Sequence, residues 1–425
     1  MPFEVKTEKL VYGGEALAHH NGRAVLVSRA LPGERIEVEE VRTAKGVTHA
    51  RPVHVLAPAP ERVPAPCPYF GRCGGCHYQH FVAEAQVAAK AEILRETLYR
   101  IGKIAWNSEI RVHTAGPWYY RNQAQFKVQR KPDGQVSIGF FEAESHRICP
   151  VDACLIISPL LNRTLAALRA PEMTARFSNC SEIVVLADDR DEKTLLTVMG
   201  NFTGGEAEEL ASNCLATLPG ATTVACQLQS GWRVFGEPSF TYQVKGLKYR
   251  ISPTAFFQTS RFLMPQLVDS VTENASGELA LDLFAGVGLL SLPLATQFAE
   301  LLAVEVHPAA ARDLVANSRT NALRNIRVEE KSAFDVLRRY PRTRPELVVL
   351  DPPRAGAGAQ ALMLLAALAP SEIRYVSCHP PTLARDLALL AARGYVVQSI
   401  ELFDFFPQTF HIESLAKLSA PGPGR

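Results

Sequence analysis

A cysteine and a glutamate in the C-terminal part of the chain could together carry out covalent chemistry. Cys378 ends the short predicted strand 373–378 and is followed by a histidine and two prolines. A thiol at such a strand end can act as a nucleophile, although a lone cysteine is more often an inert core residue. Glu413 alternates with Thr409 and His411, so on a strand these three side chains would share one face. From that face Glu413 could act as a general base, the alternative being an ordinary solvated carboxylate.

A glycine-containing turn at 282–288 is typical of a site for an adenosyl ligand. It joins the predicted strand 279–284 to a helix, and its glycines let a ligand approach the backbone closely. Glu305 ends the next strand, 23 residues after Asp282, where a carboxylate can accept hydrogen bonds from both ribose hydroxyls. Ser291 stands where the dinucleotide fingerprint has its third glycine. This favours S-adenosylmethionine over NAD, and a turn without a ligand is the remaining alternative.

A third motif, Asp351-Pro-Pro-Arg354, follows a later strand. Its prolines stiffen the loop and fix the directions of the carboxylate and the guanidinium. Because parallel strands end at one edge of a sheet, the adenosyl turn, Cys378 and Glu413 should meet there. A thiolate that adds to C6 of uracil makes C5 nucleophilic toward a methyl sulfonium, and a base must then remove the C5 proton. This reaction needs one thiol, one base and a methyl donor, which are the groups predicted at this edge.

Three further cysteines lie close together in the pattern Cys67-x5-Cys73-x2-Cys76. Soft ligands at this spacing indicate a metal centre, whose fourth ligand would be Cys149 or Cys154. The spacing alone does not choose between a [4Fe–4S] cluster and zinc. Nine cysteines in 425 residues are too few for a disulfide scaffold and indicate a reducing compartment. The other cysteines are expected to fill core positions: Cys180, Cys214 and Cys226.

The elements that must position these residues fall into three parts. Residues 1–56 alternate as short strands between Gly and Pro turns, which predicts a small β-barrel. Residues 57–250 start with a proline-rich linker and continue as mixed helix and strand, which predicts a central α+β domain. Residues 251–425 repeat the strand–turn–helix pattern of a doubly wound, Rossmann-like parallel sheet. The predicted fold class is therefore α/β with β-rich appendages.

Seven motifs spread over nearly the whole length make the chain resemble the RNA uracil-5-methyltransferases that act on tRNA or 23S ribosomal RNA. The motifs lie at 67–76, 120–123, 252–260, 281–288, 351–354, 377–380 and 406–413. The resemblance implies that Cys378 is the nucleophile and that Glu413 takes the C5 proton. It also implies four contacts to S-adenosylmethionine, from Gln258, Phe284, Glu305 and Asp351.

The same resemblance implies a [4Fe–4S] cluster held by Cys67, Cys73, Cys76 and Cys154. Residues 1–56 look like the TRAM barrel found in several RNA-modifying enzymes. The helix near 82–110 is expected to pack on the Rossmann-like catalytic domain rather than on the central one. The chain departs from residues common in the family at three positions, of which Ser332 is expected near the adenine: Leu289, Ser260 and Ser332.

The predicted partner is RNA, bound locally, because a net charge of +2 excludes a strongly basic wrapper of nucleic acid. Basic, aromatic and amide side chains suited to contacting unpaired bases occur together at Arg111, Tyr119, Tyr120, Arg121, Gln123, Phe126, Lys127, Arg130 and Lys131. The alternative is that half of them simply form the two faces of a sheet. We expect the target uridine to flip out of its stack. The barrel and the cysteine cluster favour 23S ribosomal RNA, with uridine 54 of tRNA as the alternative.

Two alternatives come from other functional classes. A non-catalytic RNA-binding iron–sulfur protein would need neither Cys378 nor Glu413, and Ser291 disfavours an NAD oxidoreductase. The N-terminal residues lack the apolar core of a signal peptide, and the apolar stretch 279–296 is interrupted by Asp, Gly and Pro. We therefore expect a cytoplasmic monomer without a membrane partner.

Overall fold

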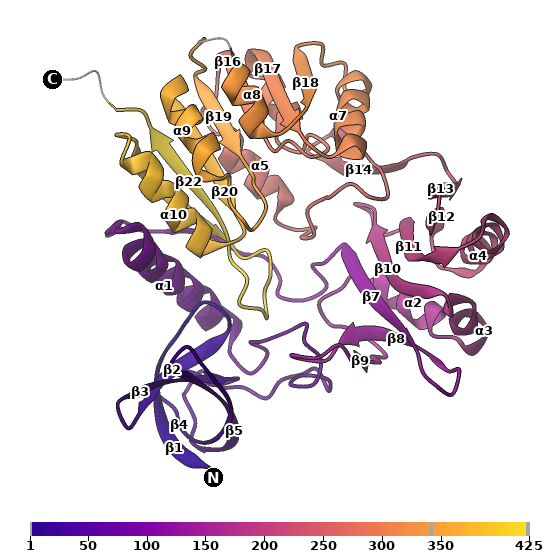
Figure 1. Ribbon diagram of the computed structural model, residues 1–425, viewed down its shortest axis with the longest axis vertical. Coiled ribbons are helices and arrows are strands. Elements are labelled where there is room, and N and C mark those ends of the chain that lie inside the picture. The colour runs from indigo at the N-terminus through magenta and orange to yellow at the C-terminus, as the bar shows by residue number, and fades with distance from the viewer. Residues whose placement is uncertain (1, 341–342, 422–425) are drawn as a thin grey trace.

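The N-terminal strands close into a five-stranded barrel. The computed structural model describes residues 2–340 and 343–421 and is shown in Figure 1. Alternate side chains such as Val5, Val27 and Ile36 point into the barrel, as the alternating sequence predicts. The barrel order is β1-β2-β3-β5-β4, which confirms the predicted small barrel. Its strands are β1 (Phe3–Leu10), β2 (Glu15–His20), β3 (Arg23–Ser28), β4 (Arg35–Ala44) and β5 (Val47–Ala57).

The segment after the barrel crosses to the C-terminal part of the molecule. Helix α1 (Ala83–Gly102) packs against helix α10 (Pro380–Ala391), so closely that a Cβ on Gly102 would lie 2.7 Å from the Ala384 carbonyl oxygen. Strand β6 (Arg111–His113) then pairs in parallel with β21 (Val396–Phe403). Both elements fall in the range 57–250 that the sequence suggests for the central domain, yet they contact the C-terminal sheet.

The central part is built on a seven-stranded sheet in the order β13-β12-β11-β10-β7-β8-β9. Residues 131–134 form a hairpin turn between its strands β7 and β8, with the Lys131 N–H donating to Gln135 O at 2.8 Å. The elements are β7 (Gln123–Arg130), β8 (Val136–Phe141), β9 (Ile148–Cys149), α2 (Pro159–Leu168), α3 (Pro171–Thr174), the 3₁₀ turn η1 (Ala175–Phe177), β10 (Cys180–Ala187), β11 (Thr194–Phe202), α4 (Gly204–Thr217), β12 (Ala221–Leu228) and β13 (Gly231–Gly236).

The C-terminal part is a mixed eight-stranded sheet in the order β18-β17-β16-β19-β20-β22-β21-β6. Five neighbouring strands are parallel, as predicted, but β22 runs antiparallel to both of its neighbours. A hairpin of β14 (Phe240–Val244) and β15 (Leu247–Ile251) precedes it. The other elements are α5 (Met264–Thr272), β16 (Gly277–Leu283), α6 (Ser291–Ala295), β17 (Phe298–Glu305), α7 (Pro308–Thr320), β18 (Ile326–Glu330), α8 (Ala333–Arg339), β19 (Leu347–Leu350), α9 (Ala359–Leu368), β20 (Glu372–Ser377) and β22 (Glu413–Ser419).

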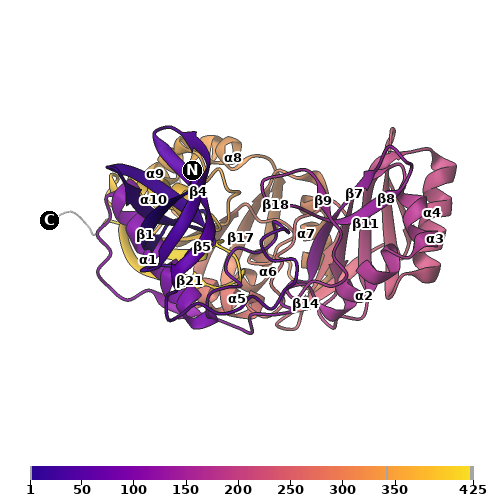
Figure 2. The same cartoon turned by 90° about the horizontal axis from the view of Figure 1, so that it is seen from below.

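Figure 2 shows the barrel and the central sheet at opposite ends of the view, with β17, β18, α6 and α7 between them and α9, α10 and β21 at the end where the barrel lies. The predicted strand containing Thr409 and His411 is wrong, because β22 begins only at Glu413 and residues 404–412 form a loop. The loop makes hydrogen bonds to α1 and to the segment before it in place of a strand partner, as described below. No helix in the described residues is long and apolar enough to cross a membrane.

A buried carboxylate fastens the barrel to the linker that follows it. Glu34 is fully buried and accepts hydrogen bonds from Leu31 N at 2.8 Å, Ala59 N at 3.2 Å and Arg62 Nη2 at 2.7 Å. Burial raises the pKa of Glu34, but these hydrogen bonds outweigh burial and leave the pKa below its ordinary value of 4.5. The ionised carboxylate therefore stabilises the folded barrel.

We predict that Glu34→Gln lowers the opening free energy of the barrel amides by about 2 kcal/mol in native-state hydrogen exchange at neutral pH. Because the folded pKa lies below 4.5, the stabilisation is present above that pH and is lost as the pH falls through the folded value. The control is Glu39→Gln, which removes an exposed pair with Arg51 and should change little. Equal effects of the two variants would contradict the anchoring role of Glu34.

Candidate active site

One cavity of about 1040 Å³ lies between the carboxyl ends of the C-terminal strands and the face of the central sheet. Its wall includes residues of β16, β17 and β22 and Cys378, which follows β20, together with residues of β7, β10 and β11 from the central sheet. All ten residues proposed from the sequence as site residues line it: Cys67, Cys73, Cys76, Cys154, Gln258, Phe284, Glu305, Asp351, Cys378 and Glu413. The tertiary structure thus brings together residues that are up to 346 positions apart.

The turn after β16, which the sequence predicts to be the adenosyl site, lies on the cavity wall. Phe284 has a φ of 149°, a strained conformation for a residue with a side chain and one that often marks a ligand loop. A Cβ on Gly286 would meet nothing within 4 Å, so this glycine borders open space, whereas one on Gly288 would lie 2.6 Å from Leu292 Cδ1. Gly286 therefore leaves room for a ligand, and Gly288 is required by packing.

Glu305 is held in place by the backbone at this end of the cavity. Its Oε2 accepts from Gly286 N at 2.8 Å and its Oε1 accepts from His307 N at 2.7 Å. The carboxylate is half-buried and lines the cavity. A charged acceptor so oriented can receive hydroxyl hydrogen bonds through its remaining lone pairs.

Asp282 is a cavity residue that the sequence analysis did not assign to the site. Burial, with Asp351 and Glu305 nearby, raises the pKa of Asp282 to about 7. Ser291 Oγ donates to Asp282 Oδ2 at 2.6 Å, while Asp282 Oδ1 is buried without a partner. Ser291 occupies the position at which a dinucleotide site would have its third glycine, and its hydroxyl orients the Asp282 carboxyl. The free oxygen is an unused acceptor of the kind that a polar ligand satisfies.

The thiol and the carboxylate of the predicted catalytic pair sit at the same end of two paired strands. Ser377 at the end of β20 pairs with Ser414 of the antiparallel strand β22, and Ser414 Oγ donates to Ser377 O at 3.1 Å. The next residues toward the cavity are Cys378 and Glu413, which the pairing places side by side. The register of a single strand pair therefore sets the relation between these two groups.

Burial controls the charge of both groups. It raises the pKa of the Cys378 thiol to about 11, an effect that Glu413 and Asp351 increase and Arg354 opposes. Burial and Asp351 raise the pKa of Glu413 well above 4.5, again opposed by Arg354. Glu413 is only 2% exposed, and its Oε1 is buried without a hydrogen-bond partner. A neutral thiol and a carboxyl of raised pKa thus face the cavity together.

Two further charged side chains of the cavity, Asp351 and Arg354, come from the single loop that follows β19. Burial raises the pKa of Asp351 to about 6, against a hydrogen bond that Gln258 Nε2 donates to its Oδ2 at 3.3 Å. Arg354 lies near His411, with 3.4 Å between Nη2 and Nδ1. Arg354, which the sequence marked only as a rigidly directed side chain, is therefore a positive charge beside the thiol and the two carboxyls.

Two aromatic contacts beside the site could not be predicted from the sequence. The ring of Tyr12, from the barrel turn after β1, meets the rings of His379 and Phe410 edge-on at centroid distances of 5.3 Å and 5.6 Å. These partners are neighbours of Cys378 and Glu413 in the chain. The barrel therefore touches the segments that carry the thiol and the carboxylate, which no local pattern at Tyr12 could indicate.

The four predicted cluster ligands gather at the other end of the cavity. Cys67, Cys73, Cys76 and Cys154 line its wall, whereas Cys149 is buried in β9. Burial raises the pKa of Cys76 to about 12, and the nearby thiols of Cys154, Cys73 and Cys67 raise it as well. Within the described residues, no three His, Cys, Asp or Glu side chains are arranged to hold a single metal ion. As expected, three other cysteines are buried in the core: Cys180, Cys214 and Cys226.

Some residues expected near ligands have structural positions instead. Tyr120 and Phe126 are fully buried in the central core, so the prediction that they stack on RNA bases is wrong. Ser332 caps α8 by accepting from Asp335 N at 3.1 Å, while Leu289 lines the cavity and Ser260 is buried. A period-two pattern of aromatic residues is compatible with either face of a sheet, which is why the sequence left this open.

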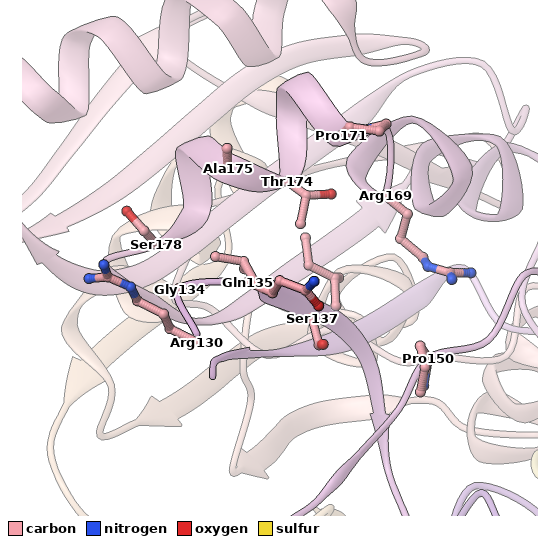
Figure 3. A pocket seen from close by; sticks show the side chains of 12 residues that line it. Arg130, Gly134, Gln135, Ser137, Pro150, Arg169, Pro171, Thr174, Ala175 and Ser178 are labelled. Atoms are coloured by element: carbon pink, nitrogen blue, oxygen red, sulfur yellow. The ribbon is translucent and has the colours of Figure 1, made fainter. Parts of the chain in front are cut away.

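Arg130 lines a second cavity in the central part, shown in Figure 3. This cavity of about 600 Å³ lies between β8 and the segment from Arg169 to Ser178. The Arg169 guanidinium is held by Asp152, with Nη1 donating to Oδ1 at 2.7 Å. None of the ten proposed site residues lines this second cavity.

Comparison with known proteins gives full-length matches. The sequence model of the family described as tRNA (Uracil-5-)-methyltransferase matches residues 237–420. An uncharacterized RNA methyltransferase of Aquifex aeolicus is 35% identical, covering 98% of both chains. A 23S rRNA (uracil(1939)-C(5))-methyltransferase of Alkalilimnicola ehrlichii is 34% identical, covering 98% of this chain and 96% of its own. In fold, the chain is similar to a Pyrococcus abyssi tRNA (uracil-54, C5)-methyltransferase solved with S-adenosyl-L-homocysteine, with a TM-score of 0.74, 23% identity and coverage of 98% and 100%.

We predict that Cys378 of the ligand-free protein reacts slowly with iodoacetamide at neutral pH. Its pKa of about 11 leaves little thiolate, so labelling should accelerate roughly tenfold per pH unit up to that value. Peptide mass spectrometry at several pH values measures the rate, and Cys378→Ser identifies the labelled peptide. Rapid labelling at pH 7 would contradict a thiol kept neutral by its surroundings.

Proposed function

Because this chain belongs to the RNA uracil-5-methyltransferase family and is an S-adenosylmethionine-dependent RNA (uracil-C5)-methyltransferase, we propose that it forms 5-methyluridine in 23S ribosomal RNA through Cys378 and Glu413. The observation that carries the catalytic assignment is the pairing of Ser377 with Ser414, which sets the thiol beside the buried carboxyl in the cavity. Glu413 Oε1 is buried without a hydrogen-bond partner, so this oxygen is available for a role in the reaction.

The proposed reaction uses the two side chains in sequence. The Cys378 thiolate adds its electron pair to C6 of the flipped uracil, and the C5–C6 π electrons move toward C5 and O4. Bound S-adenosylmethionine would supply the methyl group: C5 forms a bond to the methyl carbon, the sulfur–methyl bond breaks with its electron pair staying on sulfur, and S-adenosylhomocysteine leaves. Glu413 removes the remaining C5 proton, the C–H electrons re-form the C5–C6 double bond, and the C6–S bond breaks to return the thiolate.

The electrostatics of the cavity support this order of events. The Cys378 thiol must first lose its proton, and Arg354 is the positive side chain beside it that favours the thiolate. A cationic ligand in the cavity would act in the same direction. Because burial and Asp351 raise the pKa of Glu413, its carboxylate is more basic than an exposed one and suited to removing a carbon-bound proton.

The adenosyl end fits the methyl donor. Gln258, Phe284, Glu305 and Asp351 are proposed to hold it, around the open space that Gly286 leaves. Glu305 is oriented by two backbone N–H groups, which suits it to the ribose hydroxyls. The orphaned Oδ1 of Asp282 adds an acceptor at the same end.

A [4Fe–4S] cluster is proposed on Cys67, Cys73, Cys76 and Cys154. The four cysteines line the same cavity. Burial raises the pKa of Cys73, Cys76 and Cys154, and bound iron would compensate the charge of their thiolates. Four thiolates also suit zinc, which is the alternative. The cluster would cross-link two loop segments, residues 67–76 and the loop that contains Cys154.

The proposed substrate is 23S ribosomal RNA. The relative from Alkalilimnicola ehrlichii, 34% identical over nearly the whole chain, bears a 23S rRNA name, which favours ribosomal RNA over uridine 54 of tRNA. We assign residues 1–56 as a TRAM-type RNA-binding barrel, 57–250 as the iron–sulfur domain and 251–425 as the methyltransferase domain. We also propose that the chain acts on RNA as a cytoplasmic monomer.

We predict that cells lacking this chain lose 5-methyluridine at a 23S ribosomal RNA site and keep it in tRNA, as mapped by mass spectrometry of RNA fragments. The wild-type gene should restore the modification, and Cys378→Ala should reduce turnover by at least about 1,000-fold.

Cys180→Ala changes a buried cysteine outside the cavity and serves as the control that should restore methylation. Loss of the tRNA modification instead would move the assignment to tRNA. Methylation by Cys378→Ala would remove that thiol from the mechanism.

We predict about four iron atoms per chain and a brown colour after anaerobic purification. Cys154→Ser should lose iron, whereas the matched variant Cys149→Ser should retain it, because Cys154 lines the cavity with the other three proposed ligands and Cys149 does not. Metal analysis with absorption spectroscopy measures both. A colourless protein with one zinc would overturn the cluster assignment, and iron loss in Cys149→Ser alone would reverse the choice of ligand.

A further inference from the structure

The loop that leads into Glu413 is held in an unusual conformation. Residues 404–412 connect β21 to β22, and Figure 1 shows this stretch descending toward the region between α1 and the central sheet. Gln408 in this loop has a φ of 66°, the left-handed region that glycine normally occupies. A residue with a side chain keeps such a conformation only when its surroundings hold it there.

Those surroundings come from residues more than 300 positions earlier in the chain. Gln86 on α1 accepts from Gln408 N at 2.9 Å and donates from Nε2 to Gln408 Oε1 at 3.0 Å. The backbone N–H groups of His77 and Tyr78, directly after Cys76, both donate to Gln408 O at 2.8 Å and 3.0 Å. The main chain and the side chain of Gln408 are thus all fixed from outside the loop.

The Gln86 side chain has no freedom left for another role. It is 1% exposed, and its amide also donates to the carbonyl of Phe81 at 2.8 Å. One helical turn later, Lys90 Nζ donates to Asp404 Oδ1 at 2.6 Å and to Phe406 O at 2.9 Å. Two side chains spaced i,i+4 on one face of α1 therefore hold the start and the middle of the loop.

The proton-removal step of Glu413 should depend on this loop more strongly than the addition step of Cys378. Cys378 is carried by β20 and by the start of α10, which the loop does not contain. Glu413 follows the loop directly and makes no hydrogen bond through Oε1 that would fix its carboxyl. The carboxyl direction is therefore set by the backbone that enters β22.

We propose that Gln86 is a positioning residue for the proton-removal step, because it holds Gln408 and through it the approach of Glu413 to the C5 proton. This inference rests on the proposed role of Glu413 as the base. It assigns a specific step to α1, a helix that lies outside the methyltransferase sheet in sequence.

The test uses Gln86→Met, which keeps the side-chain length and removes both amide bonds to Gln408. With RNA containing ordinary uridine, the variant should accumulate the covalent methylated RNA–enzyme adduct on denaturing gels. Turnover should fall about tenfold or more, with KM values for RNA and S-adenosylmethionine unchanged. Thr97→Val is the matched control on α1, since Thr97 Oγ1 bonds only to Ile93 O of its own helix at 2.6 Å.

A second variant keeps the test decisive if Gln86→Met folds poorly. Gln408→Gly tolerates the left-handed backbone and preserves the backbone bonds, but it removes the side-chain bond to Gln86. It should show a smaller slowing with the same adduct. If turnover and adduct fall together in both variants, in step with lost folded protein, Gln86 is merely structural and the inference is overturned.

Glu413→Gln, run in parallel, separates this inference from the proposed function. If Glu413→Gln accumulates the adduct but neither Gln86→Met nor Gln408→Gly does, only the role of Gln86 is overturned. Normal turnover without adduct in Glu413→Gln would instead remove Glu413 as the base, and the inference would fall with it.

Discussion

The pairing of β20 with β22 is the constraint on which the site depends. β20 belongs to the parallel part of the sheet and ends at Ser377, and β22 enters in the opposite direction at Glu413. An antiparallel neighbour brings the start of one strand to the end of the other. Had β22 been parallel, its first residue would lie at the far edge of the sheet, a strand length from the thiol. The direction of one strand therefore decides whether a thiol and a carboxyl share a cavity.

The rest of the molecule supports this pair from the outside. α1 and the segment after Cys76 hold the loop before Glu413, and Tyr12 packs against the neighbours of both groups. The N-terminal third of the chain is therefore part of the architecture of the site and does more than extend the surface. This arrangement couples the barrel and the cysteine-rich loop mechanically to the loop that enters β22.

Burial is the second physical theme, because the cavity places several ionisable groups in a poorly solvated space. The pKa of Cys378 rises to about 11 and that of Asp282 to about 7, and Glu413 shifts upward as well. Like charges within one cavity make each further ionisation harder, and Arg354 offsets only part of this cost. Ligands that bring positive charge or hydrogen-bond donors would therefore change the protonation of the site as they bind.

The sequence by itself determined which local structures form and which residue types could do chemistry. Alternation predicted the barrel, strand–turn–helix repeats predicted the C-terminal sheet, and the motifs singled out ten residues that all line one cavity. These features are short-range, so a window of a few residues contains the information. Tertiary structure alone decided that Glu413 begins a strand rather than continuing one, that Tyr120 and Phe126 are core, and that Gln86, Tyr12 and Asp282 adjoin the site. These outcomes depend on contacts between residues up to 398 positions apart, and no local sequence pattern encodes the free energy of such contacts.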